Sequence, residues 1–210
     1  MQSLIELVNN LKESNVKNII GERMKEFEEL GKQSDNEIFK ELCFCFLTAN
    51  FNAKGGIRIQ KEINDGFLHL SQNNLSEELA RLGHKFPNAR AKFIFEARKY
   101  KDGIKNLLGS FSDDKTARSW FAENIKGLGM KESSHFLRNI GYKNVAIVDF
   151  HIVDVLVKHS LIEKPKSKSL TPKRYVEIEN ILRELAKKTD LSLGELDLYL
   201  WYLETGQILK

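Results

Sequence analysis

The fold is decided by one stretch, residues 120–156, which reads WFAENIKGLGMKESSHFLRNIGYKNVAIVDFHIVDVL. Its apolar spacing and turn residues predict three helices, over 122–126, 130–139 and 150–161. The first two flank a tight turn, Gly127-Leu128-Gly129, in which two glycines let the backbone reverse and Leu128 packs between the helices. Amide N–H groups at such a turn lie near a helix N-terminus, so Gly127 and Gly129 are predicted to hold a phosphate. An ordinary turn between two helices is the alternative interpretation.

Two ionisable residues follow the turn. Lys131 lies in the first turn of the second helix, where the positive end of the helix dipole disfavours an ammonium ion. Partial burial there is expected to lower the pKa of the lysine and make its amine available as a nucleophile. Asp149, eighteen residues later, ends the apolar run 145–148 and is predicted to cap the next helix. A surface lysine and a purely capping aspartate are the alternatives, but a capping carboxylate can also present an oxygen to a cleft.

The rest of the chain is also helical in pattern, with three prolines and no clear strand or repeat. An apolar face recurs every three or four residues over 36–50. Cap residues predict helix starts at Asn74, Thr171-Pro172 and Ser192, and another helix over 88–100. The lysine-rich segment 163–169 is the predicted connector. The expected fold class is all-α.

Composition excludes several classes of protein. The chain has 210 residues, of which 41% are hydrophobic and 30% charged, as in soluble globular proteins, and its net charge of +4 allows a polyanionic partner. No apolar run approaches the ~20 residues of a membrane span, and no secretory signal is evident, so a cytoplasmic location is expected. Cys43 and Cys45 are expected to be buried thiols. Two cysteines exclude an iron–sulfur cluster with four cysteine ligands.

The combination of Gly127-Leu128-Gly129-Met130-Lys131 with Asp149 resembles the helix-hairpin-helix glycosylase superfamily. Longer segments resemble one branch, the type-2 8-oxoguanine DNA glycosylases of archaea and thermophilic bacteria. The segments that carry this likeness are KESSHFLRNIG (131–141), VDFHI (148–152), LDLYLWYLETG (196–206), LCFCFLTANF (42–51) and GGIRIQ (55–60). The likeness runs from about residue 20 to the end. Phe150 departs from it, because an arginine often follows the aspartate in this branch.

The resemblance implies a helix-hairpin-helix glycosylase fold, with two helical lobes flanking a cleft in a single domain, 1–210, whose segment 120–156 carries the hairpin and the aspartate. It also implies a bifunctional enzyme. The amine of Lys131 attacks the sugar carbon that bears 8-oxoguanine and forms a Schiff base, and β-elimination then cuts the strand at the abasic site. Asp149 stabilises positive charge on the sugar. No metal-ligand spacing is present, and this lysine chemistry needs no cofactor.

Three further residues are expected to recognise the base after it is flipped out of the duplex. Trp201 and Phe86 are candidates for stacking on it, although core packing is the alternative for each. The resemblance implies that the C-terminal lysine, Lys210, distinguishes 8-oxoguanine from guanine. Ile208 and Leu209 are expected to pack back and hold this terminus near the Trp201 helix, whereas a frayed end is the alternative. His135 is expected to be structural.

Two other functions remain open at this point. One is a glycosylase and lyase for another oxidised base, such as a pyrimidine. The other is a helix-hairpin-helix DNA-binding module without catalysis, in which Lys131 is only a charge contact. The expected partner is double-stranded DNA containing oxidised guanine or abasic sites, bound by a monomer that does not contact membranes and is associated with the nucleoid through DNA.

Overall fold

The computed structural model describes residues 1–167 and 169–210, and all the regular structure in those ranges is helical. Lys168, in the predicted connector 163–169, lies outside the described residues, and residues 163–167 form no helix. The elements are α1 (Gln2–Lys12), α2 (Val16–Lys32), α3 (Asp35–Thr48), α4 (Ala53–Ile63), α5 (Gly66–His69), α6 (Gln72–Arg81), α7 (Pro87–Ala97), the 3₁₀-helix η1 (Arg98–Gly103), α8 (Ile104–Gly109), α9 (Asp114–Asn124), α10 (Met130–Asn139), α11 (Phe150–Lys158), α12 (Pro172–Thr189) and α13 (Leu193–Thr205).

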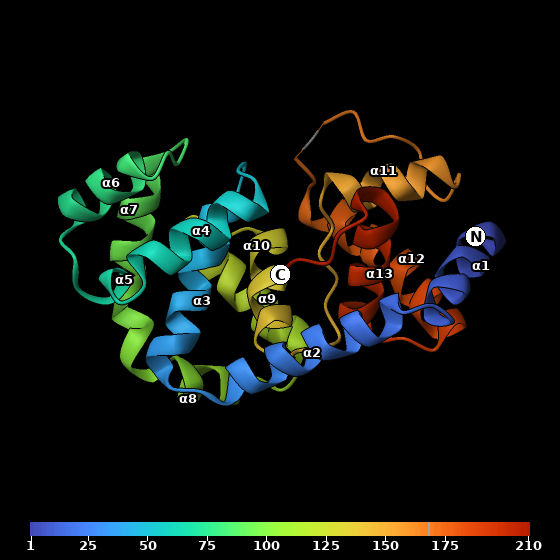
Figure 1. Ribbon diagram of the computed structural model, residues 1–210, viewed down its shortest axis with the longest axis horizontal. Helices are drawn as coiled ribbons and strands as arrows, with labels where there is room; N and C mark the ends of the chain where they lie inside the picture. The colour runs from blue at the N-terminus through green and yellow to red at the C-terminus, as the bar shows by residue number, and fades with distance from the viewer. Residues whose placement is uncertain (168) are drawn as a thin grey trace.

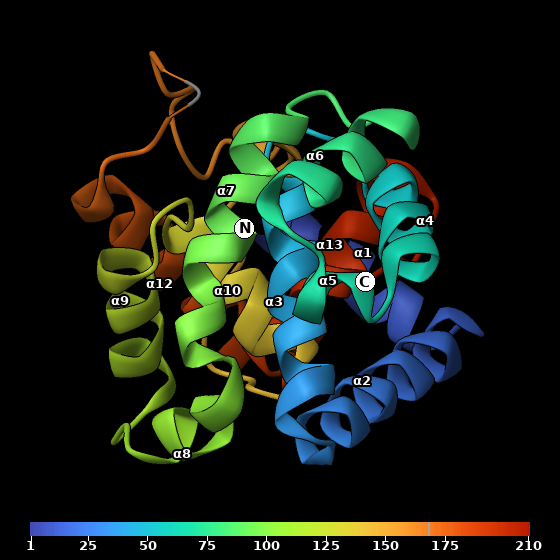
Figure 2. The same ribbon diagram turned by 90° about the vertical axis from the view of Figure 1, so that its left-hand side faces the viewer.

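These helices form two lobes (Figure 1). The first lobe is built around α3, which begins at a Ser34 cap and is buried from Ile38 to Leu47. Its core is rich in phenylalanine and continues through α4, α6, α7, α9 and α10. Figure 2 faces this lobe and shows α3 among its neighbours. Cys43 and Cys45 lie in this core as free thiols, which confirms that expectation.

The second lobe packs α1, α11, α12 and α13 around a separate aliphatic core. Helix α2 joins the lobes: Met24 and Phe27 belong to the second core, whereas Leu30 packs on the first. A Cβ at Gly31 would lie 2.1 Å from the carbonyl oxygen of Ile140, so only glycine permits this close approach of α2 to the end of α10. The end of α10 is thus held against a helix that contributes to both cores.

The predicted caps of the second lobe are confirmed. Thr171 accepts from the amide of Arg174, Ser192 and Glu195 form a capping box, and Gly206 ends α13 in the left-handed conformation. Two boundaries in the first lobe differ from prediction. Helix α6 begins after Ser71 rather than at Asn74, because the Ser71 hydroxyl accepts from the Asn74 amide. The helix predicted over 88–100 ends at Ala97 and continues as η1, where the guanidinium of Arg98 donates to the carbonyls of Phe67 and Leu70.

Among residues 1–167 and 169–210, none of the helices has the length and hydrophobicity of a membrane span.

Candidate active site

The hairpin is formed by α9, the turn at residues 125–129 and α10. Helix α9 is longer than the predicted 122–126, because Asp113 caps it by accepting from the Thr116 amide at 2.9 Å. Leu128 is buried between the helices, as expected. Only one of the two glycines is needed for the turn itself: Gly127 has φ +94°, and a Cβ there would lie 2.4 Å from the Phe93 ring. Gly129, with φ −108°, is in extended backbone that any residue adopts.

Glu132 organises the start of α10. One of its carboxylate oxygens accepts from the backbone amide of Gly129 at 3.3 Å, and the other lies 3.0 Å from the Nζ of Lys131. The Lys131 side chain is about one-third exposed, so its amine can be reached from outside. Sequence reasoning missed this role of Glu132, although its position three residues after Gly129 is the usual signal for such a cap.

Asp149 ends the extended run 145–148, which is buried between the lobes' helices, and caps α11 through the Ile152 amide at 2.9 Å. Burial raises the pKa of the Asp149 carboxyl, while hydrogen bonds from the α11 backbone and the charges of His151 and Lys131 oppose the shift. The charge of Lys131 therefore acts on the Asp149 carboxyl, although Asp149 follows Lys131 by eighteen residues.

A buried ion pair lies behind this site. Arg138, on α10, is 3.4 Å from Asp197 of α13, and both side chains are almost fully buried. Burial and, to a smaller extent, the charge of Asp149 raise the pKa of Asp197 to about 7, although the charge of Arg138 opposes the shift. The sequence signal for this pair was a single aspartate within the apolar run of α13, and sequence reasoning gave it no role.

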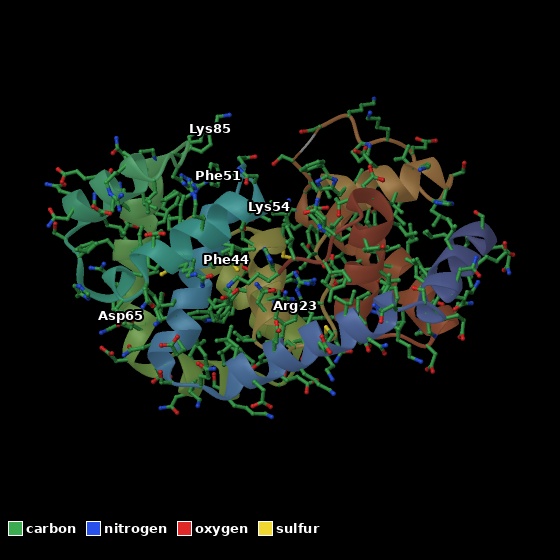
Figure 3. The ribbon with its side chains drawn as sticks, viewed as in Figure 1. Arg23, Phe44, Phe51, Lys54, Asp65 and Lys85 are labelled. Atoms are coloured by element: carbon green, nitrogen blue, oxygen red, sulfur yellow. The ribbon has the colours of Figure 1, made fainter. Side chains whose placement is uncertain are left out.

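The C-terminus returns to the first lobe and ends between the two lobes (Figure 1). Ile208 packs against the second core, as expected. The Nζ of Lys210 then reaches across to Glu41 of α3, at 2.7 Å, and to the Oε1 of Gln60 of α4. The ring of Phe44, labelled in Figure 3, has its centroid 4.3 Å from the Nζ of Lys210. The terminal residue is therefore held in place rather than frayed.

His135 lies one turn after Lys131 and is buried beside Phe44. Burial lowers the pKa of His135 well below its ordinary value, and the charges of Arg138, Lys131 and Lys210 act in the same direction. The imidazole is therefore neutral, and it lies between the helix of Lys131 and the Phe44 ring on which the ammonium of Lys210 packs.

The two aromatic candidates lie on different sides of this site. Trp201, on α13, is partly buried, and its ring meets that of His151 edge-on with the centroids 4.5 Å apart. His151 follows Asp149 by two residues, so Trp201 lies near the start of α11. Phe86 is 38% exposed and belongs to the first lobe. Phe86 is connected to the hairpin only through other side chains. The Arg90 guanidinium packs on the rings of both Phe86 and Phe93, and the Phe93 ring in turn covers Gly127.

Comparisons with known proteins agree with this arrangement. The family model described as 8-oxoguanine DNA glycosylase matches residues 20–191. The 8-oxoguanine DNA glycosylase/AP lyases of Korarchaeum cryptofilum and Methanocaldococcus jannaschii are each 52% identical, over 100% and 99% of this chain and 99% of theirs. The M. jannaschii enzyme in complex with a 15mer DNA containing 8-oxoguanine superposes with a TM-score of 0.95, 52% identity and coverage of 99% of this chain and 100% of that one.

A second solved structure, the 8-oxoguanine DNA glycosylase of Thermotoga maritima, gives a TM-score of 0.92 at 43% identity, with coverage of 100% of this chain and 99% of that one. These matches extend over both lobes and the hairpin, which confirms the predicted all-α helix-hairpin-helix fold. Both the family model and full-length relatives at this level of identity point to one assignment. The chain therefore belongs to the 8-oxoguanine DNA glycosylase family.

Proposed function

We propose that this chain excises 8-oxoguanine from double-stranded DNA and cleaves the resulting abasic site, with Lys131 as nucleophile and Asp149 as its acidic partner. Family membership supports the glycosylase and lyase activities. The observation that carries the assignment of residues is a partly exposed amine, Lys131 in the first turn of α10, together with a carboxylate, Asp149, that is held as the cap of α11. An accessible amine and a held carboxylate are the groups that Schiff-base chemistry on a sugar requires.

The reaction divides into two steps. The unprotonated Nζ of Lys131 attacks the sugar C1′, the bond from C1′ to the base nitrogen breaks, and the base leaves with a proton. The C1′–O4′ bond of the resulting aminal then breaks, O4′ takes up a proton, and C1′ forms a protonated Schiff base with Nζ. Loss of a proton from C2′ then expels the 3′ phosphate by β-elimination. The Asp149 carboxylate stabilises the positive charge that develops on the sugar and accepts or returns protons. Lys131 must leave Glu132, 3.0 Å away, before it can attack.

Recognition of the base is proposed to use the chain terminus. 8-Oxoguanine carries an N–H at N7, where guanine has a lone pair. The terminal carboxylate of Lys210 would accept from that N–H and repel the lone pair of guanine. The anchoring of Lys210 beside His135 supports this proposal, because a fixed acceptor discriminates better than a mobile one. A mismatch of this kind costs about 1–3 kcal/mol, or roughly tenfold to a hundredfold in rate.

The remaining contacts with DNA are proposed from exposure and position. Trp201 is expected to stack on the flipped base, since it adjoins the Asp149 segment. Phe86 stands exposed beside the ammonium of Lys85, a combination that suits stacking near a phosphate backbone. Figure 3 shows Lys85 with Phe51 and Lys54 along the same upper edge of the first lobe. Phosphate binding by Gly127 and Gly129 would require Glu132 to release the Gly129 amide. We expect a monomer to act on DNA in the cytoplasm.

The proposed function is tested by trapping. Wild-type protein is incubated with an abasic-site duplex or an 8-oxoguanine duplex in the presence of borohydride, which reduces a Schiff base to a stable amine. A covalent adduct is expected with both, and mass spectrometry of its peptides should place the DNA on Lys131. No adduct would indicate a DNA-binding module, and an adduct on another lysine would overturn the assignment. A duplex with an oxidised pyrimidine tests the other lesion class.

A further inference from the structure

One buried carboxylate has no part in the chemistry described above. Glu41 lies in the middle of α3, is 2% exposed and is surrounded by the apolar residues of the first core. Burial of a carboxylate is costly unless the charge is paired and both oxygens accept hydrogen bonds. The hydrogen-bond partners of the Glu41 carboxylate therefore indicate its role.

Glu41 joins three separate parts of the chain. One of its oxygens accepts from the Nδ2 of Asn139, at the end of α10, at 2.6 Å. The other accepts from the Nε2 of Gln60, in α4, at 3.0 Å and from the Nζ of Lys210 at 2.7 Å. The carboxylate thus connects the helix that carries Lys131, a neighbouring helix of the first lobe and the last residue of the chain.

The contacts of Lys210 are equally specific. Its side chain is 19% exposed, and its ammonium group contacts the charge of Glu41, the amide oxygen of Gln60 and the face of the Phe44 ring. These groups are an anion, a neutral acceptor and an aromatic face, which together replace the water that an ammonium ion loses on burial. The side chain of Lys210 is therefore occupied within the protein, and only its backbone end remains to meet a base.

We propose that Glu41 is a specificity-positioning residue: it anchors the ammonium of Lys210 so that the terminal carboxylate is fixed at the place where the damaged base is recognised. The proposal rests on the function proposed above for the terminus. It divides the last residue into two parts, a side chain that serves as an anchor and a carboxylate that reads the base. An anchored terminus is ordered before the substrate binds, so no ordering cost falls on recognition.

The test compares two substrates. In Glu41→Gln the shape of the side chain is kept and the charge is removed. Single-turnover rates are measured for excision of 8-oxoguanine and for cleavage of a preformed abasic site. We expect the excision rate to fall at least about tenfold more than the cleavage rate, the scale of one charge-assisted hydrogen bond. An equal loss on both substrates, or no loss, would overturn the proposal.

The matched control is Glu179→Gln. Glu179 is also a buried carboxylate, 1% exposed, but it is paired with Arg118 of α9 at 2.6 Å rather than with the chain terminus. Loss of its charge is expected to lower the melting temperature without changing the ratio of the two rates. A similar change of ratio in this variant would show that the effect of Glu41→Gln is only a general loss of stability.

A double-mutant cycle separates positioning from packing. Lys210→Met keeps the terminal carboxylate but removes the ammonium, so it should reproduce the selective loss of Glu41→Gln. The double variant is expected to be no slower on 8-oxoguanine than the slower single variant. Losses that multiply would show that Glu41 acts independently of Lys210. If Glu41→Gln does not fold, Lys210→Met is the test of the proposal. An excision rate equal to that of the wild type in this variant would show that the ammonium of Lys210 is not needed as an anchor.

Deletion of Lys210 tells the two proposals apart. A deletion variant without selective loss would refute base recognition by the terminus itself. The anchoring role of Glu41 alone would be refuted if deletion of Lys210 selectively slows 8-oxoguanine excision while Glu41→Gln leaves the ratio of the two rates unchanged, as Glu179→Gln is expected to do.

Discussion

The hairpin and the chain terminus build the two halves of the site in different ways. Lys131 and Asp149 are eighteen residues apart, and each is placed by the first turn of a helix and a local cap. Lys210 is placed by Glu41, 169 residues away, and by Gln60, 150 residues away. The hairpin therefore depends on local backbone geometry, whereas the terminus depends on the complete first lobe. In the proposed mechanism this difference separates bond breaking from base recognition, and substitutions should separate them in the same way.

The largest effect is expected for Lys131→Gln. Removal of the amine removes the nucleophile, so both excision and borohydride trapping should fall below detection, while binding to a duplex persists. Stability should change by roughly 0.5 kcal/mol or less, because the side chain is partly exposed. Excision assays, trapping gels and duplex titration test this directly. Adduct formation by this variant would mean that another amine carries out the reaction.

Asp149→Asn should have the next largest effect. Asparagine caps a helix about as well as aspartate, so the melting temperature is expected to stay near that of the wild type. Turnover should fall about a hundredfold on both substrates, the scale of one lost electrostatic stabiliser. Thermal melts and single-turnover rates provide the measurement. A cap-only role would instead appear as lower stability with an unchanged rate for the folded fraction.

The two glycines of the turn provide a matched pair for the hairpin. Gly127→Ala places a side chain at φ +94° and against the Phe93 ring, so stability should fall by about 2–3 kcal/mol. Gly129→Ala meets only the Glu132 carboxylate, 3.3 Å away, and should cost well under half of that. Urea unfolding measures both. Equal losses would show that the turn does not depend on the conformation of Gly127.

A smaller, pH-dependent effect is expected for Asp197. Its pKa of about 7 in the folded protein exceeds the value of about 3.9 in an unfolded chain. Between these values the folded state keeps a proton that the unfolded state has released, so the stability of the wild type falls as pH rises through this window.

Asp197→Asn lacks this titration. Relative to the wild type, its free energy of unfolding should therefore rise by on the order of 2 kcal/mol between pH 5 and pH 8. Urea titrations of both proteins at the two pH values test the sign. If the free energy of unfolding of Asp197→Asn instead stays constant or falls relative to the wild type over this range, Arg138 holds the Asp197 carboxyl ionised.

The sequence was most informative where a function depends on neighbours in the chain. The turn at Gly127, the first-turn position of Lys131 and the capping role of Asp149 all have local signals, and family resemblance joined them to a fold and an activity. Helix boundaries were less certain where two cap residues compete, as Ser71 and Asn74 do. Propensity alone does not choose between them.

Contacts between distant segments had no such signal. Nothing around Glu41 indicates that its carboxylate meets the last residue, and nothing around Asp197 indicates Arg138 as its partner. Each is a charged residue within an apolar helix, which shows that a partner is needed but does not identify it. Only the packing of the lobes supplies the partner.

In the proposed mechanism the hairpin performs the chemistry and the terminus selects the base. The most direct test deletes Lys210 and measures single-turnover rates on an 8-oxoguanine duplex and on an abasic-site duplex, with Lys131→Gln alongside. We predict that the deletion slows excision roughly tenfold to a hundredfold more than abasic-site cleavage, while Lys131→Gln abolishes both. Equal losses on the two substrates after deletion of Lys210 would show that the terminus does not select the base.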